Sequence, residues 1–282
     1  MQRVAIFGVG LIGGSFALAL RKAGFQGEII GVSSSRTIAE AVELGVIDRG
    51  AEPLEAAREA DLIYLAQPVL TIIETLRSLG PEFRDDALVT DAGSTKSAIV
   101  AAARSSVRRA LFLGGHPMAG KERRGVAAAD PDLFVGRNYL LTPMNPPDEF
   151  TERVSEFKLW VEQIGALTAI LSSDDHDRMV AYVSHAPQLL STALAAVISQ
   201  VPDAEKVAGP AVLEMTRLAA SPFDVWKDIF ATNRDNVVTA VTEVIQKLNQ
   251  LTELVGKDIL QKEFQSGAEG ADLLRRRKSS SK

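Results

Sequence analysis

The glycine-rich stretch near the N-terminus constrains the fold of this chain more than any other feature. In "RVAIFGVGLIGGS" a short apolar, β-branched run leads through Gly8, Gly10 and Gly13 into a helical pattern. Here Gly8 permits a tight turn, Gly10 lets backbone approach a pyrophosphate, and Gly13 lets the helix pack against the strand. The N-terminus of such a helix faces the anion. We therefore predict a dinucleotide-binding loop, rather than a glycine-rich turn in an unrelated α/β protein.

Strand-like and helix-like segments alternate over the first half of the chain. This alternation is typical of βαβ units and a parallel sheet, and strands as apolar as these are usually covered on both faces. The predicted strands after the first are "EIIGV", "DLIYLAQ", "ALVTDA", "ALFLGG", "NYLLTP" and "ALTAIL".

The pattern changes near Ser172, and the remaining segments are helical only. The first is "DDHDRMVAYVSHAPQLLSTALAAVISQ", with an acidic first turn, and a second long helix is predicted from "SPFDVWKDIF" to "QLTELV". We expect an α/β Rossmann-type dinucleotide-binding domain over residues 1–172, an all-helical domain over residues 173–275, and a disordered basic tail over residues 276–282.

Composition excludes several classes of function. The chain has no cysteine, which rules out disulfides, thiol catalysis and cysteine-ligated metals, and no metal site is predicted. A net charge of −5 argues against binding to nucleic acid or to an anionic membrane. No apolar run approaches the ~20 residues of a membrane span, and the glycine-broken N-terminus does not resemble a signal peptide. We expect a cytoplasmic protein.

The segment "GVSSSRT" follows the second predicted strand, where an acidic residue would bind both ribose hydroxyls of NAD. Ser33 and Ser34 instead offer neutral donors, and Arg36 can fork onto a phosphate. The segment favours NADP over NAD, although a looser NAD site with a solvated Arg36 is the alternative. The predicted cofactor residues are Gly8, Gly10, Leu11, Ile12, Gly13, Ser33, Ser34, Arg36, Gln67 and Pro68.

Two reactive side chains follow predicted strands, at the carboxyl edge where such sheets bind ligands. His116 in "LGGHPMAG" lies between two glycines and a proline, which is unusual around a core histidine. Histidine is also the natural general base near neutral pH, so a core and a catalytic role both remain open. Ser94 in "TDAGSTK" is, from that segment alone, better interpreted as an ordinary helix N-cap, with Thr95 as another possible cap.

The other two histidines lie on the first helix of the second half. His176 and His185 are nine residues apart, so on a straight helix they face opposite sides and only one lines a site. We expect His185 to be that one, since Arg178 shares its face and Pro187 bends the helix beside it. His176 is then a helix-start or surface residue.

Arg217 lies among apolar neighbours, where it needs a substrate carboxylate, a structural salt bridge or solvent.

Together these segments resemble the prephenate/arogenate dehydrogenase family of tyrosine biosynthesis. The matching motifs are "GVGLIGGS", "DAGSTK", "GGHPMAG", "DDHDRMVAYVSHAPQ" and "TRLAASPFDVWKDIF", in the family's order and over nearly the whole chain. The resemblance implies a homodimer formed through the helical domain, and oxidative decarboxylation of a cyclohexadienyl substrate with hydride transfer to NAD(P). It implies that His116 accepts the proton of the substrate hydroxyl and that Ser94 orients that pair. His185 and Arg217 match substrate-binding residues.

The chain departs from the family pattern beside the site motifs. Lys121 and Glu122 follow "HPMAG", where the family often has threonine, and we expect both near the substrate, with a solvated Lys121 as the alternative. Gln188 replaces a common histidine after "SHAP". These differences leave the choice between prephenate and arogenate open. The chain length also leads us to expect no fused mutase and no regulatory domain.

Two other functions fit the sequence less well. A β-hydroxyacid dehydrogenase relative normally carries a lysine on the first long helix of the second domain, and "DDHDRMVAYVSHAPQ" has none. A non-catalytic dinucleotide-sensing protein has no need of His116, Ser94 and Arg217 together.

Overall fold

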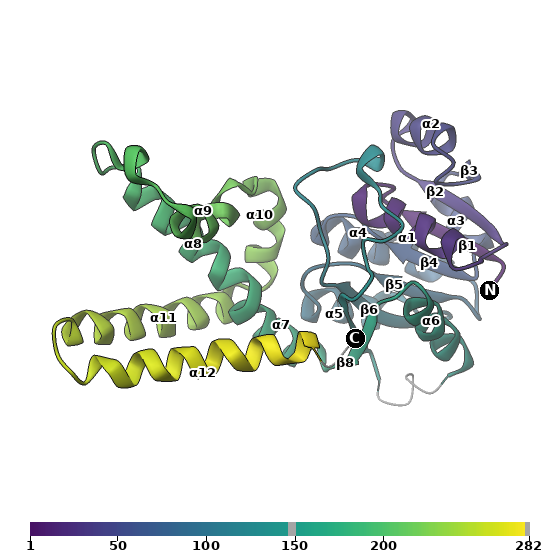
Figure 1. Ribbon diagram of the computed structural model, residues 1–282. Coiled ribbons are helices and arrows are strands. Elements are labelled where there is room, and N and C mark those ends of the chain that lie inside the picture. The colour runs from purple at the N-terminus through teal and green to yellow at the C-terminus, as the bar shows by residue number, and fades with distance from the viewer. Residues whose placement is uncertain (146–150, 280–282) are drawn as a thin grey trace.

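One eight-stranded sheet organises the first half of the chain (Figure 1). The computed structural model describes residues 1–145 and 151–279. The strand order is β3-β2-β1-β4-β5-β6-β7-β8. The strands are β1 (Arg3–Phe7), β2 (Glu28–Val32), β3 (Arg49–Gly50), β4 (Leu62–Leu65), β5 (Leu88–Asp91), β6 (Leu111–Pro117), β7 (Asn138–Pro143) and β8 (Leu167–Ile170).

Helices cover both faces of this sheet, as its apolar strands predict. On one face Phe16 of α1 stacks on Tyr64 of β4, with ring centroids 4.0 Å apart, and Phe157 of α6 joins the same core. On the other face α3, α4 and α5 supply a second apolar core, which includes Ile72 and Ile99. The helices of this half are α1 (Leu11–Lys22), α2 (Ser35–Glu43), α3 (Pro53–Glu59), α4 (Val69–Leu79), α5 (Ser97–Ser106) and α6 (Glu152–Gln163).

The sheet differs from the prediction in two respects. The two-residue strand β3 was not predicted, because Arg49–Gly50 carries no apolar pattern. Strand β7 runs antiparallel to β6, although the other pairs are parallel. A parallel return needs a long crossover, usually an α-helix. The connection from β6 to β7 has only a short 3-10 turn, η2 (Val126–Ala128), and the chain turns back on itself.

The second half, as far as the structure describes it, contains helices and turns but no strand. A π-helical turn, η4 (Ala181–His185), joins α7 to α8, and 3-10 turns flank α9. In Figure 1 the last helix runs back alongside α11. The elements are α7 (Ser173–Val180), α8 (Ala186–Ile198), η5 (Ala204–Val207), α9 (Pro210–Thr216), η6 (Arg217–Ala220), α10 (Phe223–Thr232), α11 (Arg234–Leu254) and α12 (Leu260–Ser279), and the first half adds η1 (Gly80–Glu82).

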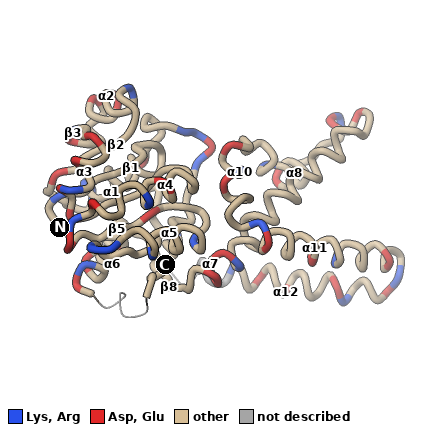
Figure 2. Tube along the Cα trace, turned by 180° about the vertical axis from the view of Figure 1, so that it is seen from behind, with Lys and Arg blue, Asp and Glu red and all other residues tan. Residues whose placement is uncertain are grey.

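Two predictions for the helical half are wrong. The long helix expected from Ser221 onward is broken at Asn233, whose backbone (φ −130°, ψ 27°) leaves the helical region between α10 and α11. The basic tail expected to be disordered is helical through Ser279, because α12 continues into it; residues 280–282 lie outside the described part. No helix in the described ranges is long and apolar enough to cross a bilayer. Basic and acidic positions are interspersed along both halves (Figure 2).

Candidate active site

A cavity of about 400 Å³ lies where the strand order reverses between β2, β1 and β4. In open α/β sheets this crevice, outside the carboxyl ends of the strands, is where dinucleotides bind. The cavity brings together five of the predicted cofactor residues: Gly8, Gly10, Ser33, Gln67 and Pro68. It also contains residues that the sequence did not indicate: Val9, Val32, Thr37, Ala66, Thr71 and Gly125.

The three loop glycines have different structural roles. Gly8 has φ +92°, a conformation that favours glycine, and its N–H donates to the carbonyl oxygen of Val32 at 2.9 Å. A Cβ at Gly13 would lie 2.2 Å from the carbonyl oxygen of Gly8, so only glycine lets α1 pack this closely. A Cβ at Gly10 would have no neighbour within 4 Å, which leaves room for a ligand beside its backbone. Leu11 and Ile12 begin α1 and pack against the core, without lining the cavity.

The loop after β2 presents neutral and basic groups to the cavity. Ser33 is exposed and lines it, together with Thr37. Ser34 is the N-cap of α2, since its Oγ accepts a hydrogen bond from the backbone N–H of Thr37 at 3.3 Å. Arg36 is exposed, and no ion pair or hydrogen bond to another described residue holds its guanidinium. The loop therefore offers hydroxyl groups and an uncommitted cation, and no carboxylate lines the cavity.

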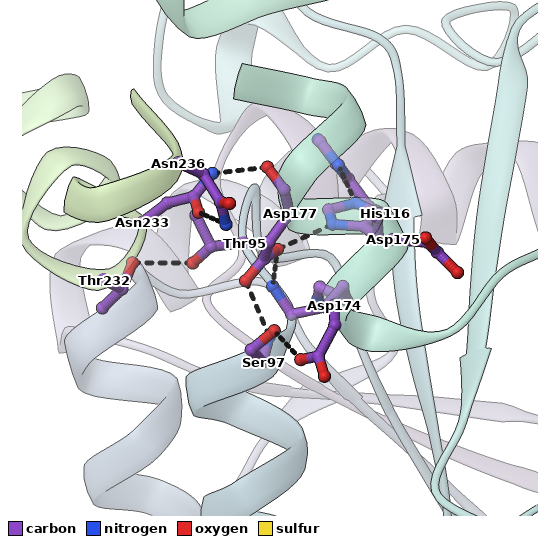
Figure 3. Close-up of polar contacts among 12 residues, drawn as sticks. Thr95, Ser97, His116, Asp174, Asp175, Asp177, Thr232, Asn233 and Asn236 are labelled. Atoms are coloured by element: carbon purple, nitrogen blue, oxygen red, sulfur yellow. Dashed lines mark hydrogen bonds and ion pairs between the residues drawn. The ribbon is translucent and has the colours of Figure 1, made fainter. Parts of the chain in front are cut away.

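His116 lies near the end of β6, with its side chain almost entirely buried. Its Nδ1 shares a hydrogen bond of 2.9 Å with Nε2 of His176. The Nδ1 of His176 in turn lies 2.8 Å from Oδ1 of Asp177, and Figure 3 labels the two end residues of this series, His116 and Asp177. His176 lies in the first turn of α7, as expected, but it is fully buried, so its assignment to the surface is wrong. The structure places it in contact with the predicted base.

The π-helical turn explains why the expected geometry of this helix fails. The wider turn rotates the chain less per residue than an α-helix does, so a straight-helix count does not apply across it. His176 and His185 are both buried and both close enough to His116 to perturb it electrostatically. Arg178 does not share their environment; it is exposed and pairs with Asp175 at 2.6 Å. The π-helical turn ends at His185, and Pro187 near the start of α8 has no N–H to donate to a regular helix bond.

A buried ion pair lies beside the base. Lys96 donates from Nζ to the carboxylate of Asp91 and, at 2.7 Å, to the carbonyl oxygen of Gly115, the residue before His116. Asp91 also accepts the N–H of Gly115 at 3.1 Å. Burial, followed by repulsion from Lys96 and from the protonated forms of His176 and His185, holds the pKa of His116 well below its usual range. His116 is therefore neutral at neutral pH and able to accept a proton.

His185 is buried against Trp226 of α10 and Asn233, which lies between α10 and α11. Its ring packs edge-to-face against Trp226, with centroids 6.0 Å apart. Its Nδ1 lies 3.3 Å from Nδ2 of Asn233, which also donates to the carbonyl oxygen of Asp177 at 2.7 Å. Burial lowers the pKa of His185 to about 4, so its ring is neutral as well. Trp226 and Asn233 are supporting residues that the sequence did not reveal.

Ser94 does not cap the helix that follows it. Helix α5 begins at Ser97, and its first N–H groups are capped by Asp177 from the helical half: the N–H of Lys96 donates at 2.6 Å and that of Ser97 at 2.9 Å. The N-cap interpretation of Ser94 and Thr95 is therefore wrong. Ser94 is partly buried in the loop after β5, and no hydrogen bond of its side chain to a described residue is formed.

The other residues predicted to bind the substrate, Arg217, Lys121 and Glu122, are exposed rather than buried beside His116. Arg217 begins η6, is exposed and has no ion-pair partner in the described ranges, so the structural salt bridge is not observed. Lys121 pairs with Asp130 at 2.6 Å, and Glu122 is exposed beside it.

Gln188 is buried. Its Nε2 donates to the carbonyl oxygen of Leu218 at 2.9 Å, and its Oε1 has no partner in the described part of the chain. No group of metal-binding side chains occurs among the described residues.

The fold and the cavity define a dinucleotide-dependent dehydrogenase, and comparison with known proteins gives its family. The model of the prephenate dehydrogenase nucleotide-binding domain matches residues 16–169, and that of the prephenate dehydrogenase dimerization domain matches residues 172–265. The chain therefore belongs to the prephenate dehydrogenase family. It is 32% identical over 264 residues to prephenate dehydrogenase of Lactococcus lactis, covering 91% of this chain and 72% of the relative.

Two solved structures are similar over nearly their whole length. Prephenate dehydrogenase from A. aeolicus, in complex with hydroxyphenyl propionate and NAD+, has a TM-score of 0.88 at 33% identity, covering 97% of this chain and 98% of the other. Arogenate dehydrogenase from Synechocystis has a TM-score of 0.83 at 29% identity, covering 97% and 100%. The similarity extends to enzymes named for either of the two substrates.

Proposed function

We propose that this protein catalyses the oxidative decarboxylation of prephenate or arogenate with hydride transfer to a nicotinamide dinucleotide. The observation that carries the proposal is His116: a neutral, buried imidazole at the carboxyl edge of the sheet that also bears the dinucleotide cavity. Family membership supports the same reaction. The alternative of a non-catalytic sensor does not account for a base held in this way.

The residues of the chain have separate roles in this reaction. The glycine loop fits a dinucleotide, because a Cβ at Gly8 or Gly13 would collide with backbone while the space beside Gly10 is free. The bound dinucleotide supplies the hydride acceptor. His116 takes the proton of the ring hydroxyl through Nε2 as hydride leaves the same carbon. It returns the proton to that oxygen when carbon dioxide departs and the ring becomes aromatic. The driving force lies in the substrate, and the protein contributes orientation.

The substrate residues are assigned by the family pattern. We propose that Ser94 orients the hydroxyl toward His116, and that His185 and Arg217 bind the substrate. The uncommitted guanidinium of Arg217 supports a carboxylate partner. Lys121 and Glu122 remain candidates at the mouth of the site, although Lys121 already pairs with Asp130.

We further propose that the cofactor is NADP in preference to NAD. Ser33 and Thr37 line the cavity, and Arg36 is free to reach a 2′-phosphate. The hydroxyl of Ser34 already accepts the N–H of Thr37 as the N-cap of α2. Ser33 is therefore the stronger candidate for contact with the 2′-phosphate. The absence of a carboxylate from the lining removes the group that would repel the phosphate.

Assembly and location complete the proposal. We propose a boundary between the two domains near residue 172, and a homodimer formed through the helical half. Exposed apolar side chains in that half, among them Val207, Met215, Phe223 and Phe264, support a buried partner surface. A cytoplasmic location, and the lack of nucleic-acid and membrane partners, stay predictions from the sequence.

A two-by-two assay tests the proposed reaction. Purified protein is given prephenate or arogenate, each with NAD or NADP, and the fluorescence of the reduced dinucleotide is followed. We expect turnover of at least one substrate, with a higher kcat/KM for NADP than for NAD. Omission of substrate is the control. Lack of reduced dinucleotide with both substrates and both cofactors would refute the dehydrogenase function.

The substitution Ser33→Asp tests the cofactor preference. A carboxylate at this position is expected to lower the kcat/KM ratio of NADP over NAD by at least about tenfold, because it repels the 2′-phosphate and accepts from the ribose hydroxyls. The matched control is Ser35→Asp, which adds the same charge at the first residue of α2, outside the cavity lining. An unchanged ratio in Ser33→Asp would contradict this interpretation of the loop and leave the dehydrogenase function intact.

A further inference from the structure

A chain of buried hydrogen bonds leads from the proposed base to an acidic residue of the helical half. His116 Nδ1 and His176 Nε2 are 2.9 Å apart, and His176 Nδ1 and Asp177 Oδ1 are 2.8 Å apart. All three side chains are buried. The Nε2 of His116 makes no hydrogen bond to another described residue. This series of hydrogen bonds therefore leaves the Nε2 of His116 free, and Nε2 is the nitrogen that accepts the proton in the proposed reaction.

The direction of every bond in this chain follows from its acidic end. Burial alone would raise the pKa of Asp177, but hydrogen bonds from His176 and from the N–H groups of Ser97 and Lys96 hold it below its usual value. An ionised carboxylate only accepts, so the Nδ1 of His176 donates to it. Burial lowers the pKa of His176, so its ring is neutral, and its Nε2 carries the lone pair and accepts from the Nδ1–H of His116. The Nε2 of His116 is then left with its own lone pair.

We propose that His176 and Asp177 are positioning residues that hold His116 in the tautomer whose Nε2 carries the lone pair, ready to accept the substrate proton. The opposite tautomer places two lone pairs face to face inside the protein. Once Nε2 has taken the proton, the same bonds stabilise the imidazolium, because the negative charge of Asp177 acts on it through His176. This inference rests on the proposed function.

No other acid near His116 is available for this role. The titratable groups that face His116 are His176, Asp177 and His185 from the helical half, and Asp91 and Lys96 from the β5–α5 connection. Asp91 is committed to Lys96 and to backbone N–H groups. His185 is neutral and is turned to Asn233. In the described structure, Asp177 is the only acidic residue that shares a hydrogen bond with a histidine ring nitrogen, the Nδ1 of His176.

Asp177 also caps α5, so a change at Asp177 mixes a catalytic with a structural effect. A direct test measures which ring nitrogen of His116 carries the proton. The chain has three histidines, so [¹⁵N]histidine-labelled full-length protein yields three ring spin systems. Single variants assign them. At pH 8 we expect protonated Nδ1 and unprotonated Nε2 in both His116 and His176. A protonated Nε2 on His116 would overturn the proposal, whether or not the protein proves to be a prephenate dehydrogenase.

A matched pair of variants measures the consequence for turnover. In His176→Gln the amide oxygen reaches the position of Nε2 and still accepts from His116, whereas the shorter amide of His176→Asn does not. We expect kcat to fall about 10²-fold in His176→Asn, by analogy with loss of the residue that orients a catalytic histidine, and about tenfold or less in His176→Gln. The dissociation constant of NADP should stay unchanged in both.

The pH profile separates positioning from mere packing. His176→Asn removes the acceptor that stabilises protonated His116, so the acid limb of kcat/KM should move to lower pH. A role in packing alone would lower activity without moving this limb, and that outcome would contradict the proposal. Equal kcat values for the asparagine and glutamine variants would contradict it as well. If neither variant folds, the nitrogen measurement on the unaltered protein still decides.

Discussion

Replacing His116 by asparagine is expected to lower kcat by about 10³-fold, because the variant lacks the nitrogen that accepts the substrate proton. The asparagine amide nitrogen takes the place of Nδ1 and still donates to His176, so the buried bond of 2.9 Å at that end is retained. The fold and the affinity for NADP should therefore stay at their wild-type values. Steady-state kinetics and a fluorescence titration with NADPH measure the two quantities.

His185→Asn is the matched comparison for this experiment. His185 is also buried and neutral, but it is proposed to bind substrate without taking a proton. Its replacement should raise KM more than it lowers kcat. Turnover of His116→Asn within about tenfold of the wild type would remove His116 from the role of base.

The second large effect is expected at the glycine loop, where substitutions of Gly10 and Gly13 should both weaken NADP binding but differ in their effect on stability. A Cβ at Gly13 would lie 2.2 Å from the carbonyl oxygen of Gly8 and 2.8 Å from Cγ2 of Ile6. Gly13→Ala should lower the free energy of unfolding by about 1–3 kcal/mol and weaken NADP binding, since the loop must move. Gly10→Ala meets no atom within 4 Å and should change the free energy of unfolding by less than about 0.5 kcal/mol.

Gly10→Ala should nevertheless weaken NADP binding by at least about tenfold, because the added methyl group occupies the approach of the pyrophosphate. Denaturant unfolding and NADPH titration, applied to both variants, separate stability from binding. Wild-type affinity in Gly10→Ala would mean that the dinucleotide does not approach this backbone. Wild-type stability in Gly13→Ala would mean that the contact between α1 and the loop is not tight.

The parts of the fold that follow from local pattern could be predicted from the sequence. The apolar runs and the helical periods give the long strands, the covering helices and the all-helical second half. The direction of β7 could not be predicted, because an apolar strand has the same pattern whichever way it runs. The break at Asn233 was missed for a similar reason: the apolar period continues across it from α10 to α11.

In the candidate site, too, some residues could be predicted from the local sequence and others could not. The glycine loop and His116 were predictable because their chemistry shows in the adjacent residues. His176 was assigned to the surface because the count of residues assumed a regular helix, and the π-helical turn breaks that count. Asp177 and Lys96 meet across 81 positions of sequence, so no local signal marks either one.

The contact between Asp177 and the start of α5 has a consequence for motion. Ser97 Oγ donates to Asp174 at 2.9 Å and the hydroxyls of Thr95 and Thr232 are 2.7 Å apart, so several bonds fasten the helical half to this one point. The N–H of Leu70 in α4 also donates to Asp228 of α10 at 3.1 Å, so a hinge movement that keeps these bonds leaves both contacts between the halves in place. His116 and His176 lie next to the contact between Asp177 and the start of α5. The base is therefore assembled before a substrate arrives, and closure has only to deliver the substrate to it.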